Sequence, residues 1–159
     1  AAYGNHCLGD LFVFFFFGWG SLMGAYYVQT QTVDSSALFL GTAIGLLSAG
    51  VLNLNNMRDI ANDKNSQKIT LVVFLGSQKA KYYHYLLMIF SVLFLFFGMG
   101  KTWVKESPLS LLIMLPIVLQ LYQVVKIRDP KAYDPLLKQL ALSTFFVSLS
   151  LFVIYYCYQ

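Results

Sequence analysis

Long apolar segments with almost no charge constrain this chain more than any other feature of its sequence. Five such segments, each close to the ~20 residues that cross a bilayer, alternate with short polar stretches. They cover about residues 11–28, 37–53, 82–99, 109–125 and 140–156. With 58% hydrophobic and only 11% charged residues, the chain is expected to have lipid as its solvent. The sequence therefore predicts an all-α integral membrane protein with about five transmembrane helices.

A few residues within these segments predict how the helices begin, bend and pack. Asp10 opens the first segment, where a carboxylate suits the positive end of a helix. Gly18, Gly20 and Gly24 lie in the first segment, and Gly41 and Gly45 form a G-x-x-x-G pattern in the second. Small residues of this kind let helices approach closely in lipid, so we expect close packing there. Pro116 lies inside the fourth segment and predicts a kink.

Positive charge is concentrated in the stretches that follow the second and fourth segments. The Lys and Arg residues there are Arg58, Lys64, Lys68, Lys79, Lys81, Lys126, Arg128, Lys131 and Lys138. Only Lys101 and Lys105 fall elsewhere. Basic loops mark the cytoplasmic side of a membrane protein, so both stretches are predicted to face the cytoplasm. A net charge of +4 that is concentrated in two loops indicates orientation and no nucleic-acid partner.

The stretch of residues 53–75 is the one place where the apolar sequence turns densely polar. Asp59 and Asp63 are four residues apart, and on a helix they would share a face and repel each other by ~0.2–0.5 kcal/mol. An ordinary solvated helix relieves such repulsion with Lys or Arg three or four positions away. Neither aspartate has one at those spacings. We therefore predict that these two carboxylates lack a basic partner and await a cation from elsewhere.

Two carboxylates at a membrane surface suit Mg²⁺, which binds through one or two carboxylates plus substrate phosphates. Asn55 and Asn56 extend the same face one turn back and are candidates to ligate or orient. Arg58 offers a bidentate fork and Lys68 a point charge for phosphate oxygens. Such a site would assist the loss of a diphosphate leaving group. The D-x-x-x-D pattern alone is weak evidence. The alternative is therefore that this stretch is a solvated loop helix without a catalytic role.

The sequence around these residues resembles a known motif. The run N-N-M-R-D-I-A-N-D at 55–63, then K-I-T-L-V-V-F-L-G at 68–76 and Y-Y-H at 82–84, is similar to the second aspartate-rich motif of the UbiA superfamily of intramembrane prenyltransferases. The run L-G-D-L-F-V-F-F-F-F-G at 8–18 and the D-P pair at 134–135 also resemble that family. Within it, the resemblance is closest to members that act on 1,4-dihydroxy-2-naphthoate in menaquinone biosynthesis.

The resemblance implies a nine-helix bundle in the bacterial inner membrane, with two aspartate-rich loops on the cytoplasmic side. It implies transfer of a polyprenyl group from polyprenyl diphosphate to 1,4-dihydroxy-2-naphthoate, with decarboxylation to demethylmenaquinone and with Mg²⁺ as cofactor. It assigns metal binding and catalysis to Asp59 and Asp63. The residues that it assigns to the diphosphate are Asn55, Asn56, Arg58 and Lys68.

The chain departs from the family pattern in two ways. No second Asn/Asp cluster is present, and five spans fall short of nine. We therefore expect residues 1–159 to be the C-terminal half of one transmembrane prenyltransferase domain, inactive without the missing N-terminal half. The other departure is local: Gln67 stands where the family usually has Gly, and Phe74 where Arg is common.

Two other functions fit parts of the pattern. The first is prenyl transfer to another aromatic acceptor, such as 4-hydroxybenzoate. A non-enzymatic membrane subunit, such as half of a transporter or an assembly factor, would also use glycine-rich helices. It would, however, carry ionisable residues deep within its spans, and this chain has none between the ends of its apolar segments.

Overall fold

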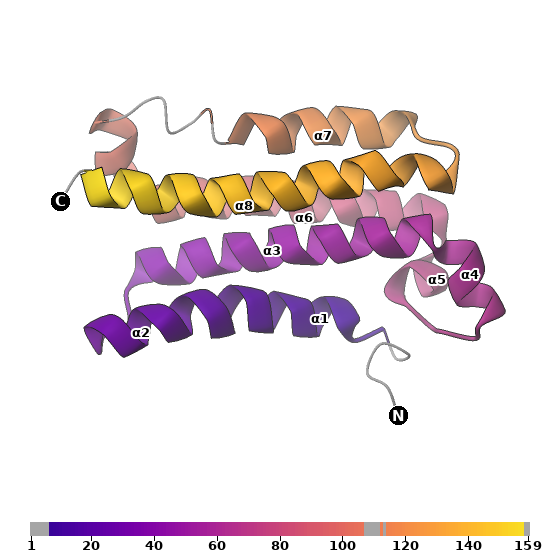
Figure 1. Cartoon of the computed structure of the whole chain (residues 1–159), viewed down its shortest axis with the longest axis horizontal. Coiled ribbons are helices and arrows are strands. Elements are labelled where there is room, and N and C mark those ends of the chain that lie inside the picture. The colour runs from indigo at the N-terminus through magenta and orange to yellow at the C-terminus, as the bar shows by residue number, and fades with distance from the viewer. Residues whose placement is uncertain (1–6, 107–111, 113, 158–159) are drawn as a thin grey trace.

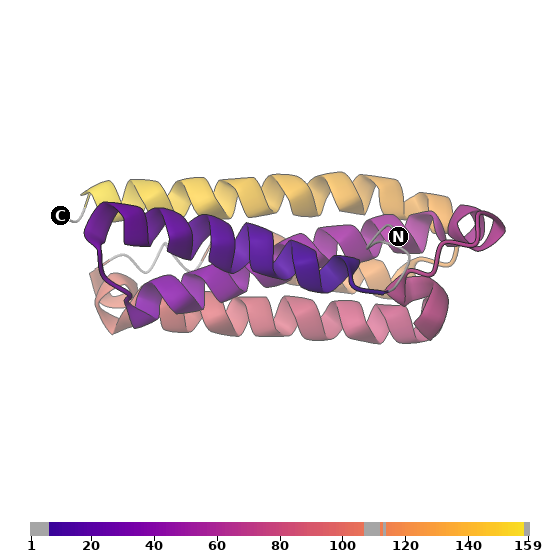
Figure 2. The ribbon, with the colours of Figure 1, turned by 90° about the horizontal axis from the view of Figure 1, so that it is seen from below.

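The computed structural model describes residues 7–106, 112 and 114–157, and within these ranges every regular element is a helix. The long helices run side by side in an elongated bundle, which Figures 1 and 2 show from two directions. Four helices are long and apolar enough to cross a membrane: Gly9–Thr30, Ser35–Arg58, Ser77–Gly100 and Pro130–Val153. The predicted all-α membrane fold is confirmed.

The first span is made of three consecutive helical segments: α1 (Gly9–Val13), η2 (Phe14–Met23) and α2 (Gly24–Thr30). The middle segment, η2, is a π-helix, with i→i+5 hydrogen bonds in place of i→i+4. The span ends where Gln31 adopts a left-handed backbone with a φ of 54°. Asp34 then caps α3 (Ser35–Arg58), because its carboxylate accepts a hydrogen bond from the Ser36 amide at 3.1 Å.

Helix α3 is the centre of the bundle and packs against the first span, α6 (Ser77–Glu106) and α8 (Tyr133–Cys157) (Figure 1). Its contact with the first span depends on glycine. A Cβ atom on Gly18 would lie 2.5 Å from the Gly41 carbonyl oxygen and 2.8 Å from the Gly45 Cα. A larger residue would force the helices apart, so the predicted close packing at these glycines is confirmed.

The fourth predicted span, residues 109–125, lies partly outside the described residues. Its described part is α7 (Leu115–Lys126), which is shorter than the length that crosses a bilayer. Pro116 lies in the first turn of α7, where the missing N–H removes no helical hydrogen bond. The kink predicted at Pro116 was wrong, because this residue begins the helix and does not interrupt it.

Helices α3, α6 and α8 extend beyond their predicted ends into polar sequence, and α6 begins at Ser77 and not at about residue 82. Helix α3 continues past residue 53 to Arg58. After the short helix η4 (Pro130–Ala132), α8 begins at Tyr133 and not at about residue 140. Hydropathy marks the part of a helix that lies in hydrocarbon, whereas backbone hydrogen bonds continue it into the interface. These extensions place the polar residues of the candidate site on helix ends.

Candidate functional site

The end of α3 and the beginnings of α6 and α8 meet at one end of the bundle, with the short helices α4 (Ile60–Asn65) and α5 (Leu71–Leu75) beside them (Figure 1). The two basic stretches therefore lie at the same end of the molecule. An ion pair between Arg58 Nη1 and Asp134 Oδ1, at 2.9 Å, joins them. This polar end holds every residue predicted for the site: Asn55, Asn56, Arg58, Asp59, Asp63 and Lys68.

Two backbone features reverse the chain between α3 and α5. Asp59 separates α3 from α4 with a φ of −95° and a ψ of 9°, while the Asp63 amide still donates to the Asp59 carbonyl oxygen at 2.9 Å. Gln67 has a left-handed φ of 56°, and the Lys68 amide then donates to the Asp63 carbonyl oxygen at 2.9 Å. This reversal returns the Lys68 side chain to Asp63.

The first of two polar clusters is the Arg58 network, formed by Asn55, Arg58, Asp59 and Asp134. Arg58 Nε and Nη2 donate to the two carboxylate oxygens of Asp59 at 2.9 and 2.8 Å. Nη2 also donates to Asn55 Oδ1 at 2.9 Å, and Nη1 binds Asp134. The guanidinium holds the pKa of the Asp59 carboxyl below its usual value.

This network overturns the prediction that Asp59 lacks a basic partner. Helical spacing excluded Arg58 because adjacent residues of a helix point in different directions. Asp59, however, lies at the break between α3 and α4, where that restriction does not hold.

The second is the Asp63 cluster, which consists of the ion pair of Asp63 with Lys68 and of Asn56, which lines a cavity together with Lys68. Lys68 Nζ lies 3.4 Å from Asp63 Oδ1, so Asp63 also has a basic partner, contrary to prediction. The Asp63 side chain is only 7% exposed, and its Oδ2 accepts no hydrogen bond from the described part of the chain. The buried Oδ1 of Asn56 likewise accepts no hydrogen bond from the described part of the chain. Buried polar atoms are seldom left unpaired, so each of these oxygens is a candidate to contact a ligand.

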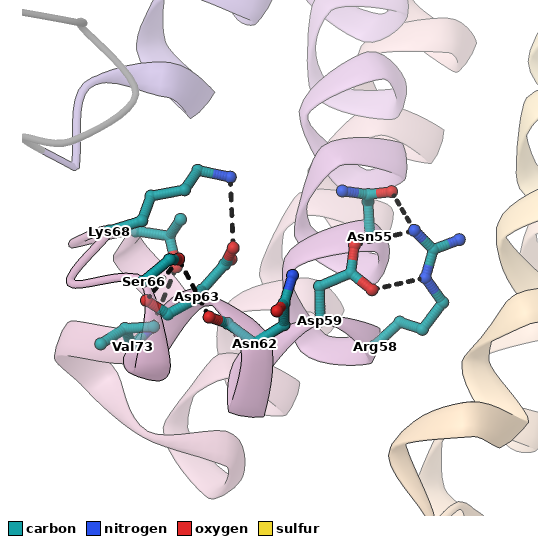
Figure 3. A network of polar contacts seen from close by, with 9 residues as sticks. Asn55, Arg58, Asp59, Asn62, Asp63, Ser66, Lys68 and Val73 are labelled. Carbon is teal, nitrogen blue, oxygen red and sulfur yellow. Dashed lines mark hydrogen bonds and ion pairs between the residues drawn. The ribbon is translucent and has the colours of Figure 1, made fainter.

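Figure 3 shows how the two carboxylates are engaged: Asp59 with Arg58, and Asp63 with Lys68. The structure thus brings all the predicted residues to one end of the bundle, but it places the two aspartates in separate ion pairs. Among the described residues, no three His, Cys, Asp or Glu side chains form a group able to hold a metal. A cation here would need amide oxygens or substrate phosphate as well, and Mg²⁺ accepts both.

One cavity adjoins the Asp63 cluster, and a second lies beside the first. The smaller, of about 60 Å³, is lined by Asn56 and Lys68 together with Asp10 and Leu71. The larger, of about 280 Å³, is mostly apolar and is lined by Asp10, Leu71 and Tyr83 among others. Because Asp10 and Leu71 line both, the polar and apolar cavities are neighbours.

Asp10 is the residue that sequence reasoning missed. It lies in the first turn of α1, as its predicted role at a helix end requires. It is also only 6% exposed, and its Oδ2 finds no hydrogen-bond donor in the described part of the chain. The available signal was a carboxylate directly before an apolar span, because ionisable residues at membrane depth are usually functional.

The fold and the polar end together define a membrane-embedded helical protein with a site of carboxylates, amides and basic groups at one end of its bundle. The profile of the UbiA prenyltransferase family matches residues 3–149. The chain belongs to the UbiA prenyltransferase family.

Similar proteins include several named 1,4-dihydroxy-2-naphthoate octaprenyltransferase. The one from Escherichia coli (strain K12) is 40% identical over 141 residues, which is 86% of this chain and 45% of that relative. The one from Haemophilus influenzae is 33% identical over 148 residues, 92% of this chain and 48% of the relative. The one from Mycobacterium leprae is 37% identical over 120 residues, 72% and 41% respectively. The chain thus spans about half the length of the curated relatives it matches. No solved structure matches it.

Proposed function

We propose that this chain, together with an N-terminal half like that of its relatives, transfers a polyprenyl group from polyprenyl diphosphate to 1,4-dihydroxy-2-naphthoate, with decarboxylation to demethylmenaquinol, the reduced form of demethylmenaquinone. The family and the names of the relatives support this reaction class and this acceptor. One observation carries the proposal: at the polar end of a membrane bundle, Asp63 and Asn56 keep buried oxygens that have no partner among the described residues, beside the cation of Lys68.

In this reaction the allylic C–O bond of the donor breaks, and its electron pair leaves with the diphosphate. The ring carbon that bears the carboxylate forms the new bond to the allylic carbon. Carbon dioxide then leaves, and the electron pair of its bond restores the aromatic ring. The tasks that fall to the protein are to neutralise the leaving diphosphate, to hold the two substrates in contact and to exclude water.

The Asp63 cluster fits a hard cation, since the unpaired atoms of Asp63 and Asn56 are both oxygen. When bound there, Mg²⁺ would neutralise charge on the diphosphate. We assign Asp59 to the metal as well, although both its oxygens contact Arg58 in this structure. Asp59 would become free to bind when Arg58 turns from it to the diphosphate.

The diphosphate is assigned to the basic and amide groups around these aspartates. Arg58 offers a bidentate fork and Lys68 a point charge, while Asn55 holds the guanidinium through its Oδ1. We further propose that this end faces the cytoplasm from the bacterial inner membrane. The basic stretches that meet there support this orientation.

The test is an assay of the protein with its N-terminal half present, in membranes, with polyprenyl diphosphate and either 1,4-dihydroxy-2-naphthoate or 4-hydroxybenzoate. We expect transfer to the naphthoate that stops with EDTA and returns with Mg²⁺. Asp63→Asn should abolish it. Asp34→Asn, at the opposite end of α3, is the matched control and should keep full activity, because Asn also caps a helix. Undiminished turnover of Asp63→Asn would overturn the proposed site, and a preference for 4-hydroxybenzoate would overturn the acceptor.

A further inference from the structure

The larger cavity joins an apolar wall to one buried carboxylate. Its apolar lining is Leu11, Phe14, Leu46, Ala49, Leu71 and Leu87. Asp10 and Tyr83 supply the polar part of the lining. Tyr83 lines the cavity together with Asp10, whose Oδ2 has no hydrogen-bond partner in the described part of the chain.

An unpaired buried carboxylate oxygen selects the chemistry of its ligand. A polyprenyl tail offers no donor, so hydrocarbon against Asp10 would leave the oxygen unpaired, which is unfavourable. A diphosphate or a second carboxylate would be repelled by like charge. A hydroxyl group can donate to it, and a hydroxyl bonded to a carboxylate makes one of the stronger hydrogen bonds found in proteins.

The size and position of the cavity narrow the choice further. About 280 Å³ lies just below the range for sites that bind small molecules, ~300–1,000 Å³. That space suits a compact ring system and not an extended prenyl chain. The cavity also adjoins the one lined by Asn56 and Lys68, where the diphosphate is proposed to bind. A ring held here would therefore lie next to the end of the donor that reacts.

We infer that Asp10 binds the aromatic acceptor by accepting a hydrogen bond from a phenolic hydroxyl, with the ring held against the apolar wall of the 280 Å³ cavity. Tyr83 is a positioning residue that holds the Asp10 carboxylate. A carboxylate on the same ring would be directed away from Asp10 by charge repulsion. This inference rests on the proposed function, because it specifies the acceptor subsite of that reaction.

The experiment measures the KM of each substrate separately, with the N-terminal half present and Mg²⁺ saturating. Asp10→Leu should raise the KM for 1,4-dihydroxy-2-naphthoate about ten- to one-hundredfold, the effect of losing a hydrogen bond to a charged group. The KM for polyprenyl diphosphate should not rise, because Asp10 also lines the cavity proposed for the diphosphate and its replacement by Leu removes a like charge there. Tyr83→Phe should raise the acceptor KM alone, by about two- to tenfold.

Acceptor analogues sharpen the test. With the wild-type protein, one of the two monomethyl ethers of the acceptor should have a KM that is higher than that of the acceptor by a similar factor. With Asp10→Leu, the KM of this ether should be close to that of the unmethylated acceptor, because the hydrogen bond can be removed only once. If methylation and Asp10→Leu raise the KM by independent factors for both ethers, the inference is overturned.

The outcomes separate this inference from the proposed function. An unchanged acceptor KM in Asp10→Leu, with transfer intact in the wild type, overturns the inference and leaves the function standing. A wild-type protein that transfers to no aromatic acceptor overturns both. Should Asp10→Leu fail to fold, Tyr83→Phe decides: without a rise confined to the acceptor KM, the inference is wrong.

Discussion

The two clusters at the polar end of the bundle contain similar residues in opposite states. In the Arg58 network, both Asp59 oxygens are paired within 2.9 Å, and the Asp59 side chain is 35% exposed. In the Asp63 cluster, the nearest cation lies 3.4 Å from one oxygen, the other oxygen has no partner in the described part of the chain, and the side chain is 7% exposed. The more buried carboxylate is thus the less satisfied one.

This difference separates the two carboxylates assigned to the metal: Asp59 is also held in an ion-pair network, whereas Asp63 keeps an oxygen open to a ligand. An exposed, fully paired carboxylate fixes the geometry of its neighbours, and it joins α3 to α8 through Arg58 and Asp134. A buried oxygen without a partner destabilises the folded chain by ~1–3 kcal/mol, and a bound cation would offset that penalty. We therefore expect activity to depend chiefly on the Asp63 cluster.

The largest expected effect is the gap in activity between two matched substitutions. Asp63→Asn should lower kcat/KM by about 10²–10³-fold or more, because it weakens the ligand set that neutralises the leaving group. Asp59→Asn should lower it by about tenfold, since it removes a carboxylate but frees Arg58 for the diphosphate. The measurement is kcat/KM for the donor at several Mg²⁺ concentrations. Equal losses would erase the distinction between the clusters.

The second effect concerns Arg58, the hub of its network. Arg58→Lys should raise the KM for polyprenyl diphosphate about tenfold, because an ammonium group cannot contact Asn55, Asp59 and Asp134 in one planar arrangement. Lys138→Gln is the control, since Lys138 is exposed and contacts only the rim of the network, 3.6 Å from Asp134. Its donor KM should change by less than about twofold. A comparable rise in both variants would mean that net charge matters and the fork does not.

A smaller effect is the pH dependence of stability. Arg58 lowers the pKa of Asp59, so the folded state gains stability from this ion pair above the ordinary pKa of ~3.9 and loses it as the pH falls through the lower, folded-state pKa. We expect wild type to exceed Asp59→Asn by at most ~1 kcal/mol in the free energy of unfolding near pH 7, and the difference to decline from about pH 4 downward, as the pH falls through the folded-state pKa. Thermal unfolding in detergent across this range measures it. A difference that grows on acidification would contradict the pairing.

The helical architecture could be predicted from the sequence because its signals are local. The length of an apolar run and the spacing of Gly41 and Gly45 act within a few turns of one helix. The ion pairs could not be predicted in this way. Arg58 meets Asp134 across 76 residues, and Lys68 meets Asp63 only because the chain reverses between them.

Burial was equally inaccessible to local reasoning. Asp10 looked like an ordinary helix-end carboxylate, and its burial depends on how α1 packs against the rest of the bundle. Phe74, the other local departure from the family pattern, is 73% exposed on α5, so its side chain adds nothing to the packing of the described residues. Conversely, Gln67 could be recognised from sequence as unusual, but the physical reason became visible only with its backbone angle.

The smallest expected effect tests the turn that places Lys68 beside Asp63. Gln67 has a φ of 56°, a conformation that disfavours a residue with a Cβ atom, and it stands where the family usually has Gly. Gln67→Gly should therefore stabilise the protein by about 0.5–1 kcal/mol, or raise its Tm by about 1–4 °C. Gln67→Ala is the matched control and should bring no gain, because it keeps the Cβ. Because only Gly relieves the strain, equal Tm values for the two variants would show that the left-handed turn is not what limits stability here.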